Sequence, residues 1–153
     1  MLQGGLDRLD LVVSETPLGK HDAGVAALSA RVRLLEAVAE TRPWMNVRVD
    51  EGGLIADIAV GYDAVVLGAD KWQQVADPAW YGGAEAARDE AVGRLPRVLL
   101  APREGFTPSG LPEGSVVLRV PAEHGVVSAS GAREGRVEWV ASEVVLLWEP
   151  PVP

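Results

Sequence analysis

The chain has 153 residues, of which 48% are apolar and 24% charged, and it contains no cysteine. This composition indicates one globular domain over 1–153, and it excludes a disordered tail, a collagen-like chain and a disulfide-linked scaffold. The 14 basic and 22 acidic side chains give a formal charge of −8, which repels a phosphate backbone and argues against nucleic acid as the main partner.

No stretch of the sequence has the composition of a targeting or membrane-spanning segment. The apolar runs are far shorter than the roughly 20 residues that cross a bilayer. The start of the chain lacks the basic and apolar regions of a signal peptide, and the absence of cysteine fits a reducing compartment. We therefore expect a cytoplasmic protein with no membrane partner.

The first predicted elements are a strand and a long helix. The strand covers 9–14 and stops at Pro17 and Gly19. A helix follows from about 23 to 40, because its apolar residues recur at steps of three and four and share one face. Pro43 ends this helix, since the residue before a proline avoids the α region.

The middle of the chain alternates between strands and helices. A strand over 45–49 is followed by a short helix over 54–60. The apolar run 64–67 has the composition of a fully buried strand. A helical turn near 71–76 and an amphipathic helix over 84–92 come next, the latter rich in good helix formers.

Two more strands are predicted over 97–100 and 116–120, with a glycine- and proline-rich loop over 102–114 between them. The apolar spacing over 137–148 fits a helix or a strand, and we favour a helix. Such alternation of strands and helices is typical of an α/β fold with one mainly parallel sheet.

Common catalytic motifs are missing from the sequence. It has no HExxH, EF-hand loop, Walker-type phosphate loop or G-x-S-x-G serine elbow. The two histidines, His21 and His124, lie far apart in the chain and are most simply interpreted as solvated loop residues. Candidate functional residues must therefore come from less specific patterns.

The first such pattern follows the strand over 9–14, at a position where open α/β sheets bind ligands. Lys20 lies in this segment, and a lysine there can act as a point charge for phosphate. An exposed loop lysine without a ligand explains the residue equally well.

The second pattern follows the buried strand over 64–67. Gly68 lets a ligand approach the backbone closely. Asp70 is placed to contact such a ligand or to cap the next helix, and capping is the simpler role. The rings of Trp72 and Trp80 either stack on a ligand or fill the core.

The third pattern, over 127–133, combines two hydroxyls, a glycine and an arginine at the start of a predicted helix. Free backbone N–H groups beside Ser128 and Ser130 favour an anion, and Arg133 can hold a phosphate with two hydrogen bonds. A serine cap followed by a surface arginine is the structural alternative, and it is favoured for this segment taken alone.

Taken in order, these segments resemble the nicotinate-mononucleotide adenylyltransferase branch of the cytidylyltransferase-like nucleotidyltransferases. That family has a P-x-x-K loop, an arginine within the next helix, a strand ending in G-A-D, a strand followed by x-x-R, and S-[ST]-x-x-R at the last helix. The matching pieces here are 17–20, Arg31 or Arg33, 67–70, 99–103 and 128–133. The resemblance covers roughly residues 6 to 140 and implies a Rossmann-like fold, an open and mostly parallel sheet with flanking helices.

The resemblance also implies an activity, namely adenylyl transfer from ATP to a pyridine mononucleotide in NAD biosynthesis, with Mg²⁺ bound alongside ATP. Catalysis would rest on positioning and charge stabilisation of a direct in-line attack. The residues implied to hold the ATP phosphates are Lys20, Ser128, Ser130 and Arg133. Those implied to surround the second nucleotide are Asp70, Trp72 or Trp80, and Arg103.

One element of the family has no match, the N-terminal strand with its G-x-F-[DN]-P-x-H-x-G-H loop. Residues 1–6 resemble the end of the helix that follows this loop. The resemblance thus implies an N-terminally shortened fold without the HxGH catalytic loop, either because the coding start lies upstream or because a shortened relative has lost the chemistry. The alternative functions are a non-catalytic nucleotide-binding or regulatory module of this fold, and a structural domain whose motifs arise by chance.

In the family, the unmatched strand lies between those that correspond to 9–14 and 64–67. Its loss leaves two sheet edges whose N–H and C=O groups must be paired, covered or used for association. We expect either direct pairing of 9–14 with 64–67 or pairing with a strand of a second copy, which would give a homodimer through a sheet edge.

Overall fold

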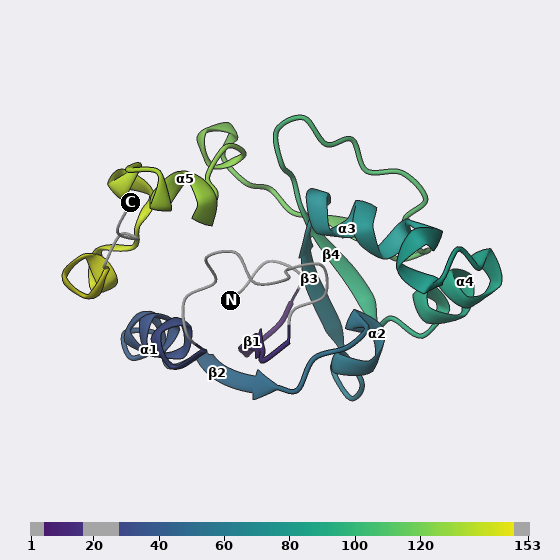
Figure 1. The fold of residues 1–153 in the computed structure, drawn as a ribbon, viewed down its shortest axis with the longest axis horizontal. Helices are drawn as coiled ribbons and strands as arrows, with labels where there is room; N and C mark the ends of the chain where they lie inside the picture. The colour runs from purple at the N-terminus through teal and green to yellow at the C-terminus, as the bar shows by residue number, and fades with distance from the viewer. Residues whose placement is uncertain (1–4, 17–27, 149–153) are drawn as a thin grey trace. The chain divides into compact units, whose positions relative to one another are not determined.

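The computed structural model describes residues 5–16 and 28–148, and the chain divides into two compact units (Figure 1). The first unit comprises Met1–Gly53 and Val127–Pro153, and the second unit comprises Leu54–Val126. Each unit contains a small parallel sheet with helices beside it. The α/β class is therefore confirmed, but the described strands form two sheets in place of one. One domain can contain two such units, so the single-domain expectation stays a prediction.

The sheet of the first unit pairs β1 (Leu9–Ser14) with β2 (Met45–Asp50) in parallel. Parallel neighbours need a crossover connection, and α1 (Leu28–Ala39) lies in this connection and contacts both strands. The predicted strands at these positions are confirmed, and α1 falls within the predicted helix, whose start lies outside the described residues. Arg31 on α1 donates a hydrogen bond to the carbonyl oxygen of Ser14 at 3.2 Å, which ties α1 to the carboxyl end of β1.

The remainder of the first unit consists of short helices, namely α5 (Ala129–Arg133) and the 3₁₀ helices η3 (Val137–Trp139) and η4 (Ser142–Leu147). The helix favoured over 137–148 is therefore present as two separate 3₁₀ turns. Val140 and Ala141 adopt extended backbone conformations between these turns, which prevents one continuous helix.

The sheet of the second unit contains three parallel strands in the order β3-β4-β5, with bounds Ala64–Gly68, Arg97–Ala101 and Val116–Val117. Ala64 lies opposite Arg97, and Leu99 lies opposite Val116. The third strand is shorter than predicted because β4 ends at Ala101. The last bond from this segment to β4 joins the N–H of Leu118 to the carbonyl of Leu100 at 2.8 Å.

Helices occupy the connections of the second unit, and most lie between β3 and β4. The helices, in chain order, are α2 (Ile55–Ile58), α3 (Ala69–Ala76), η1 (Pro78–Tyr81), α4 (Glu85–Gly93) and η2 (Ala122–His124). Each helix predicted in this part of the chain is present, with bounds that differ by a few residues. No helix in the described ranges is long and apolar enough to cross a membrane, and the longest, α1, has 12 residues.

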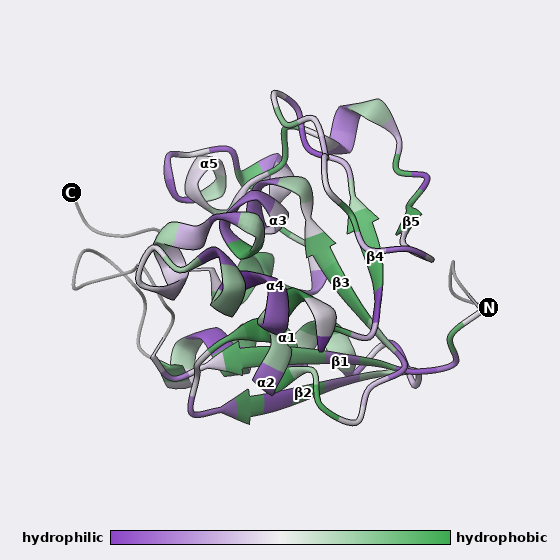
Figure 2. Ribbon diagram, turned by 90° about the vertical axis from the view of Figure 1, so that its right-hand side faces the viewer, coloured by the Kyte–Doolittle hydropathy of each residue, from purple (hydrophilic) through white to green (hydrophobic). Residues whose placement is uncertain are grey.

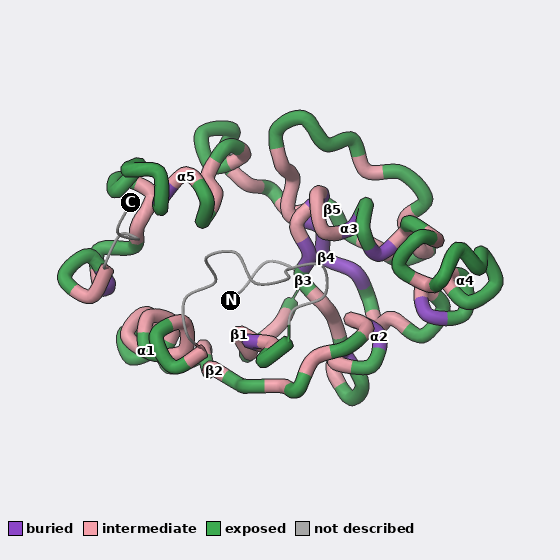
Figure 3. Tube along the Cα trace, viewed as in Figure 1, coloured by how far each residue is buried: buried purple, intermediate pink, exposed green. Residues whose placement is uncertain are grey.

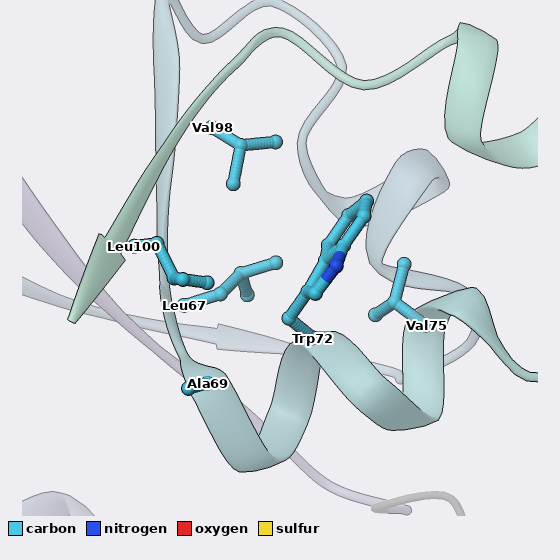
Figure 4. Close-up of a cluster of buried hydrophobic side chains, with 6 residues drawn as sticks. All are labelled: Leu67, Ala69, Trp72, Val75, Val98 and Leu100. Carbon is cyan, nitrogen blue, oxygen red and sulfur yellow. The ribbon is translucent and has the colours of Figure 1, made fainter. Parts of the chain in front are cut away.

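The core of the second unit lies between α3 and the strands β3 and β4. Its buried members are Leu67, Ala69, Trp72, Val75, Val98 and Leu100 (Figure 4). β3 and β4 are coloured as hydrophobic over most of their length, whereas hydrophobic and polar residues alternate along β2 (Figure 2). Val98, Leu99 and Leu100 are buried in succession, so both faces of β4 are covered (Figure 3). Coverage of both faces is typical of parallel sheets, and it explains the continuous apolar run.

The two sheets do not share a strand ladder in the described chain. The described strand that pairs with β1 is β2, and the one that pairs with β3 is β4. The expected direct pairing of 9–14 with 64–67 is therefore wrong. Such pairing depends on the long-range arrangement of strands and not on their local composition, so the sequence pattern could not decide it.

Candidate functional site

Two candidate residues of the second unit meet where β3 and β4 end. Asp70 lies in the first turn of α3, directly after β3, and Arg103 follows β4. Parallel neighbours end at the same edge of a sheet, and the Arg103 Nε lies 3.6 Å from the Asp70 Oδ1. Their side chains are 44% and 27% exposed for Asp70 and Arg103 respectively, so both remain accessible to a ligand.

Gly68 makes room for this pair. The backbone of Gly68 is extended, with φ −70°, so its conformation does not require glycine. A Cβ atom at this position would collide with the Asp70 Oδ1, so the Asp70 side chain would have to move to another position. Gly68 therefore allows the Asp70 carboxylate to fold back over the end of β3, and any larger residue would displace it.

The backbone around Arg103 is held on two sides. Arg103 forms an antiparallel bridge with Phe106, whose N–H donates to the Arg103 carbonyl at 3.2 Å. The N–H of Glu104 donates to the carbonyl of Gly125 at 3.1 Å. A Cβ atom on Gly125 would lie 3.2 Å from the carbonyl oxygen of Ala122, a tight contact within the turn that ends η2. The backbone of Arg103 is thus held by a local turn at Phe106 and by a distant segment at Gly125.

The two tryptophans have different surroundings. The indole of Trp72 lies among Leu67, Val75 and Val98 and is 1% exposed (Figure 4). Its Nε1 donates to the Ser109 carbonyl at 2.9 Å. The ring therefore fills the core, one of the two roles left open by the sequence, and the proposed stacking of Trp72 on a nucleotide is corrected. Trp80 on η1 is 39% exposed and retains a surface that a ligand can contact.

The third candidate segment belongs to the first unit. The Oγ of Ser128 accepts a hydrogen bond from the Gly131 N–H at 3.0 Å and caps α5, as the structural alternative expected. Arg133 is exposed, and its Nη2 donates to the Ser130 Oγ at 3.3 Å. Ser130 and Arg133 are therefore adjacent and accessible. Ser128 acts mainly through the backbone that it caps.

The structure thus brings together Asp70 with Arg103 in one unit, and Ser130 with Arg133 in the other. Lys20 lies outside the described residues. Convergence of all candidates on one site stays a prediction.

Sequence reasoning missed Gly125 and the Ser109 carbonyl as supports of the loop after β4. A main-chain acceptor leaves no signal in a sequence, and an isolated glycine signals only a turn.

The shifted titratable groups lie elsewhere. Burial raises the pKa of Tyr81, opposed by Arg88 and Arg94, and the Tyr81 hydroxyl donates to the Val75 carbonyl at 2.9 Å. The pKa of Glu143 is lowered to about 2, first by a hydrogen bond from its own backbone N–H and then by the Arg42 and Ser142 side chains. No cluster of three or more histidine, aspartate or glutamate side chains suited to a metal occurs in residues 5–16 and 28–148.

Comparison with known proteins adds no family assignment. No protein-family model matches the chain, and no curated protein matches it.

Proposed function

We propose that this chain is a nucleotidyltransferase-like domain that binds ATP and a pyridine mononucleotide. In a form of the protein that also carries the HxGH loop, it would transfer the adenylyl group of ATP to the mononucleotide in the cytoplasm. The observation that supports this proposal is the Asp70–Arg103 pair at the carboxyl ends of β3 and β4. Ligands of open α/β sheets bind at this edge.

The pair has the chemistry to recognise a nucleotide. The Asp70 carboxylate accepts hydrogen bonds from hydroxyl or amino groups, and the Arg103 guanidinium donates to oxygen atoms. A nucleotide presents both kinds of group. Trp80, partly exposed on η1, adds an aromatic surface suited to a ring.

The ATP phosphates are assigned to the segment at α5. Arg133 and Ser130 are accessible and adjacent, so they can donate together to phosphate oxygens. Lys20 would add a further positive charge. Mg²⁺ would arrive bound to the ATP phosphates and neutralise part of their charge, as it usually does with few protein ligands.

The role of the chain in the reaction is positioning. A phosphate oxygen of the mononucleotide attacks the α-phosphorus of ATP, and pyrophosphate leaves with the electron pair of the broken P–O bond. Holding both nucleotides in line lowers the entropic part of the barrier. Positive groups at the phosphates stabilise the charge that develops on them.

Calorimetric titration with magnesium ATP, and then with nicotinate mononucleotide, tests the proposal. We expect both to bind. The Arg133→Ala variant should bind ATP more weakly by about 1.5–3 kcal/mol, the scale of a hydrogen bond between charged groups. Its unfolding midpoint should change little, because Arg133 is exposed.

Arg136→Ala is the matched control, since Arg136 stacks on Trp139 at 5.0 Å and has no assigned ligand role. It should leave ATP affinity unchanged. Binding of ATP alone, without the mononucleotide, would favour the non-catalytic nucleotide-binding module. Absence of binding by both nucleotides would contradict the proposed function.

A further inference from the structure

The Asp70–Arg103 pair presents a hydrogen-bond acceptor and a donor side by side at the end of β3. Both side chains pass close to Gly68, since a Cβ atom added there would collide with the Asp70 Oδ1 and would lie 3.7 Å from the Arg103 Cγ. The carboxylate and the stem of the arginine therefore meet at one point of the sheet edge, where both side chains are partly exposed.

The spacing of the pair leaves both groups able to bind a ligand. The 3.6 Å between the Arg103 Nε and the Asp70 Oδ1 exceeds the roughly 2.7–3.2 Å of an N–H···O hydrogen bond. The two groups therefore attract each other as charges, and the Oδ1 remains able to accept a hydrogen bond. A guanidinium carries several N–H donors, so Arg103 can hold a ligand oxygen beside its contacts within the chain.

A carboxamide fits this arrangement of acceptor and donor. Its nitrogen and oxygen atoms are about 2.2 Å apart in one plane, so the amide N–H can donate to Asp70 while the amide oxygen accepts from Arg103. A carboxylate has acceptor oxygens only. One of them would face the Asp70 carboxylate at hydrogen-bond range, and two like charges at this separation repel each other.

We propose that Asp70 determines the specificity for the second nucleotide and selects a carboxamide over a carboxylate. This inference rests on the proposed function, in which the pair contacts a pyridine mononucleotide. The preferred substrate is then the amide form, nicotinamide mononucleotide, and the acid form, nicotinate mononucleotide, binds more weakly. Arg103 contacts an oxygen that both forms possess, so the discrimination comes from Asp70.

Calorimetric titration of the full chain with each mononucleotide, without ATP, tests the inference. The wild type should bind the amide form about tenfold more tightly than the acid form. Asp70→Asn should raise the affinity for the acid form about tenfold, because the asparagine Nδ2 can donate to the ligand carboxylate. The asparagine oxygen still accepts from the amide form, whose affinity should change little. A gain in affinity cannot result from a damaged fold.

Asp57→Asn is the matched control. Asp57 pairs with Arg94 at 2.7 Å in the same unit, and both side chains of that pair are about half exposed. This substitution removes the same single negative charge from a chain whose formal charge is −8. It should leave the preference for the amide form unchanged, which separates a local effect of Asp70 from an effect of net charge.

Three results would overturn the inference. A wild type that binds the acid form as tightly as the amide form does so, and so does an amide preference that persists in Asp70→Asn; both leave the proposed function intact. The amino edge of adenine also presents a donor beside an acceptor. Loss of ATP affinity in Asp70→Asn, with the mononucleotide preference unchanged, would therefore assign the pair to adenine. Binding of neither mononucleotide would contradict the proposed function together with this inference.

Discussion

Trp72 connects the core of the second unit to the loop after β4. Its indole is packed against Leu67, Val98 and Leu100, and its N–H donates to the Ser109 carbonyl. One side chain therefore contributes both apolar burial and a tether for the loop that follows Arg103. Trp80, in contrast, lies on a 3₁₀ turn at the surface, where its ring is partly exposed.

Trp72→Ala should lower the free energy of unfolding by about 3–5 kcal/mol, because it leaves a large cavity in a closely packed core. Trp72→Phe should cost less, since it keeps most of the ring but removes the hydrogen bond to Ser109. Trp80→Ala is the matched control and should cost less than about 1 kcal/mol. Urea midpoints of the three variants measure these differences. Equal losses at both tryptophans would show that Trp72 has no special role in the core.

At the scale of elements, the 3₁₀ helix η4 is attached to the end of α1 through Glu143. The Arg42 Nη1 lies 2.7 Å from the Glu143 Oε1. The hydroxyls of Thr41 and Ser142 donate to the same carboxylate at 3.3 and 3.1 Å. Arg42 also donates to the carbonyl of Val38, on α1, at 2.7 Å. These contacts join segments about a hundred residues apart in the chain.

This attachment should weaken in acid. The pKa of Glu143 falls from 4.5 to about 2 on folding, chiefly through its own backbone N–H and the Arg42 side chain. A carboxylate with a lowered pKa stabilises the fold above the unfolded-state pKa, and this contribution is lost as pH falls towards the folded-state pKa. The wild type should therefore lose stability relative to Glu143→Gln between about pH 4.5 and pH 2.

Urea midpoints over this pH range, for both proteins, measure the effect. Glu138→Gln is a matched control, because the Glu138 carboxylate lies 3.8 Å from Arg136 with both side chains well exposed. Exposed ion pairs of this kind contribute little to stability. A constant difference between wild type and Glu143→Gln from pH 7 to pH 2 would contradict the assigned role.

At the scale of the whole molecule, the chain order makes the two units unequal. The second unit is one continuous segment, Leu54–Val126, whereas the first unit is made of two segments that flank it. When the second unit unfolds, the two segments of the first unit become the ends of a long flexible loop. Bringing the two ends of such a loop together costs conformational entropy of the chain. The second unit offsets this cost while it is folded and does not once it has unfolded.

We therefore expect that the first unit does not remain folded once the second unit has unfolded. Hydrogen exchange at increasing urea concentrations, followed separately for amides of β1 and β2 and for amides of β3 and β4, measures this. Protection of β1 and β2 that persists after β3 and β4 have opened would contradict the expectation and would indicate two independent domains.

The sequence by itself determined most of the local structure. Runs such as Val98–Leu99–Leu100 are apolar and rich in β-forming residues, so their strand conformation and burial followed from composition. Breakers such as Pro43 placed the helix ends within a few residues. Asp70 was identified because it follows a predicted strand, and Arg103 was implied by the family resemblance. The parallel pairing of β3 with β4 brought the two residues together.

Only the tertiary structure decided which strands pair, which tryptophan is buried and which groups support the candidate site. The division into two sheets depends on contacts between distant segments, and the composition of a strand is similar whichever neighbour it has. Trp72 and Trp80 are alike as residues, and the packing of α3 against the sheet separated them. The role of Ser128 as a cap and the support from the Gly125 carbonyl depend on backbone geometry, which arises only when the chain has folded.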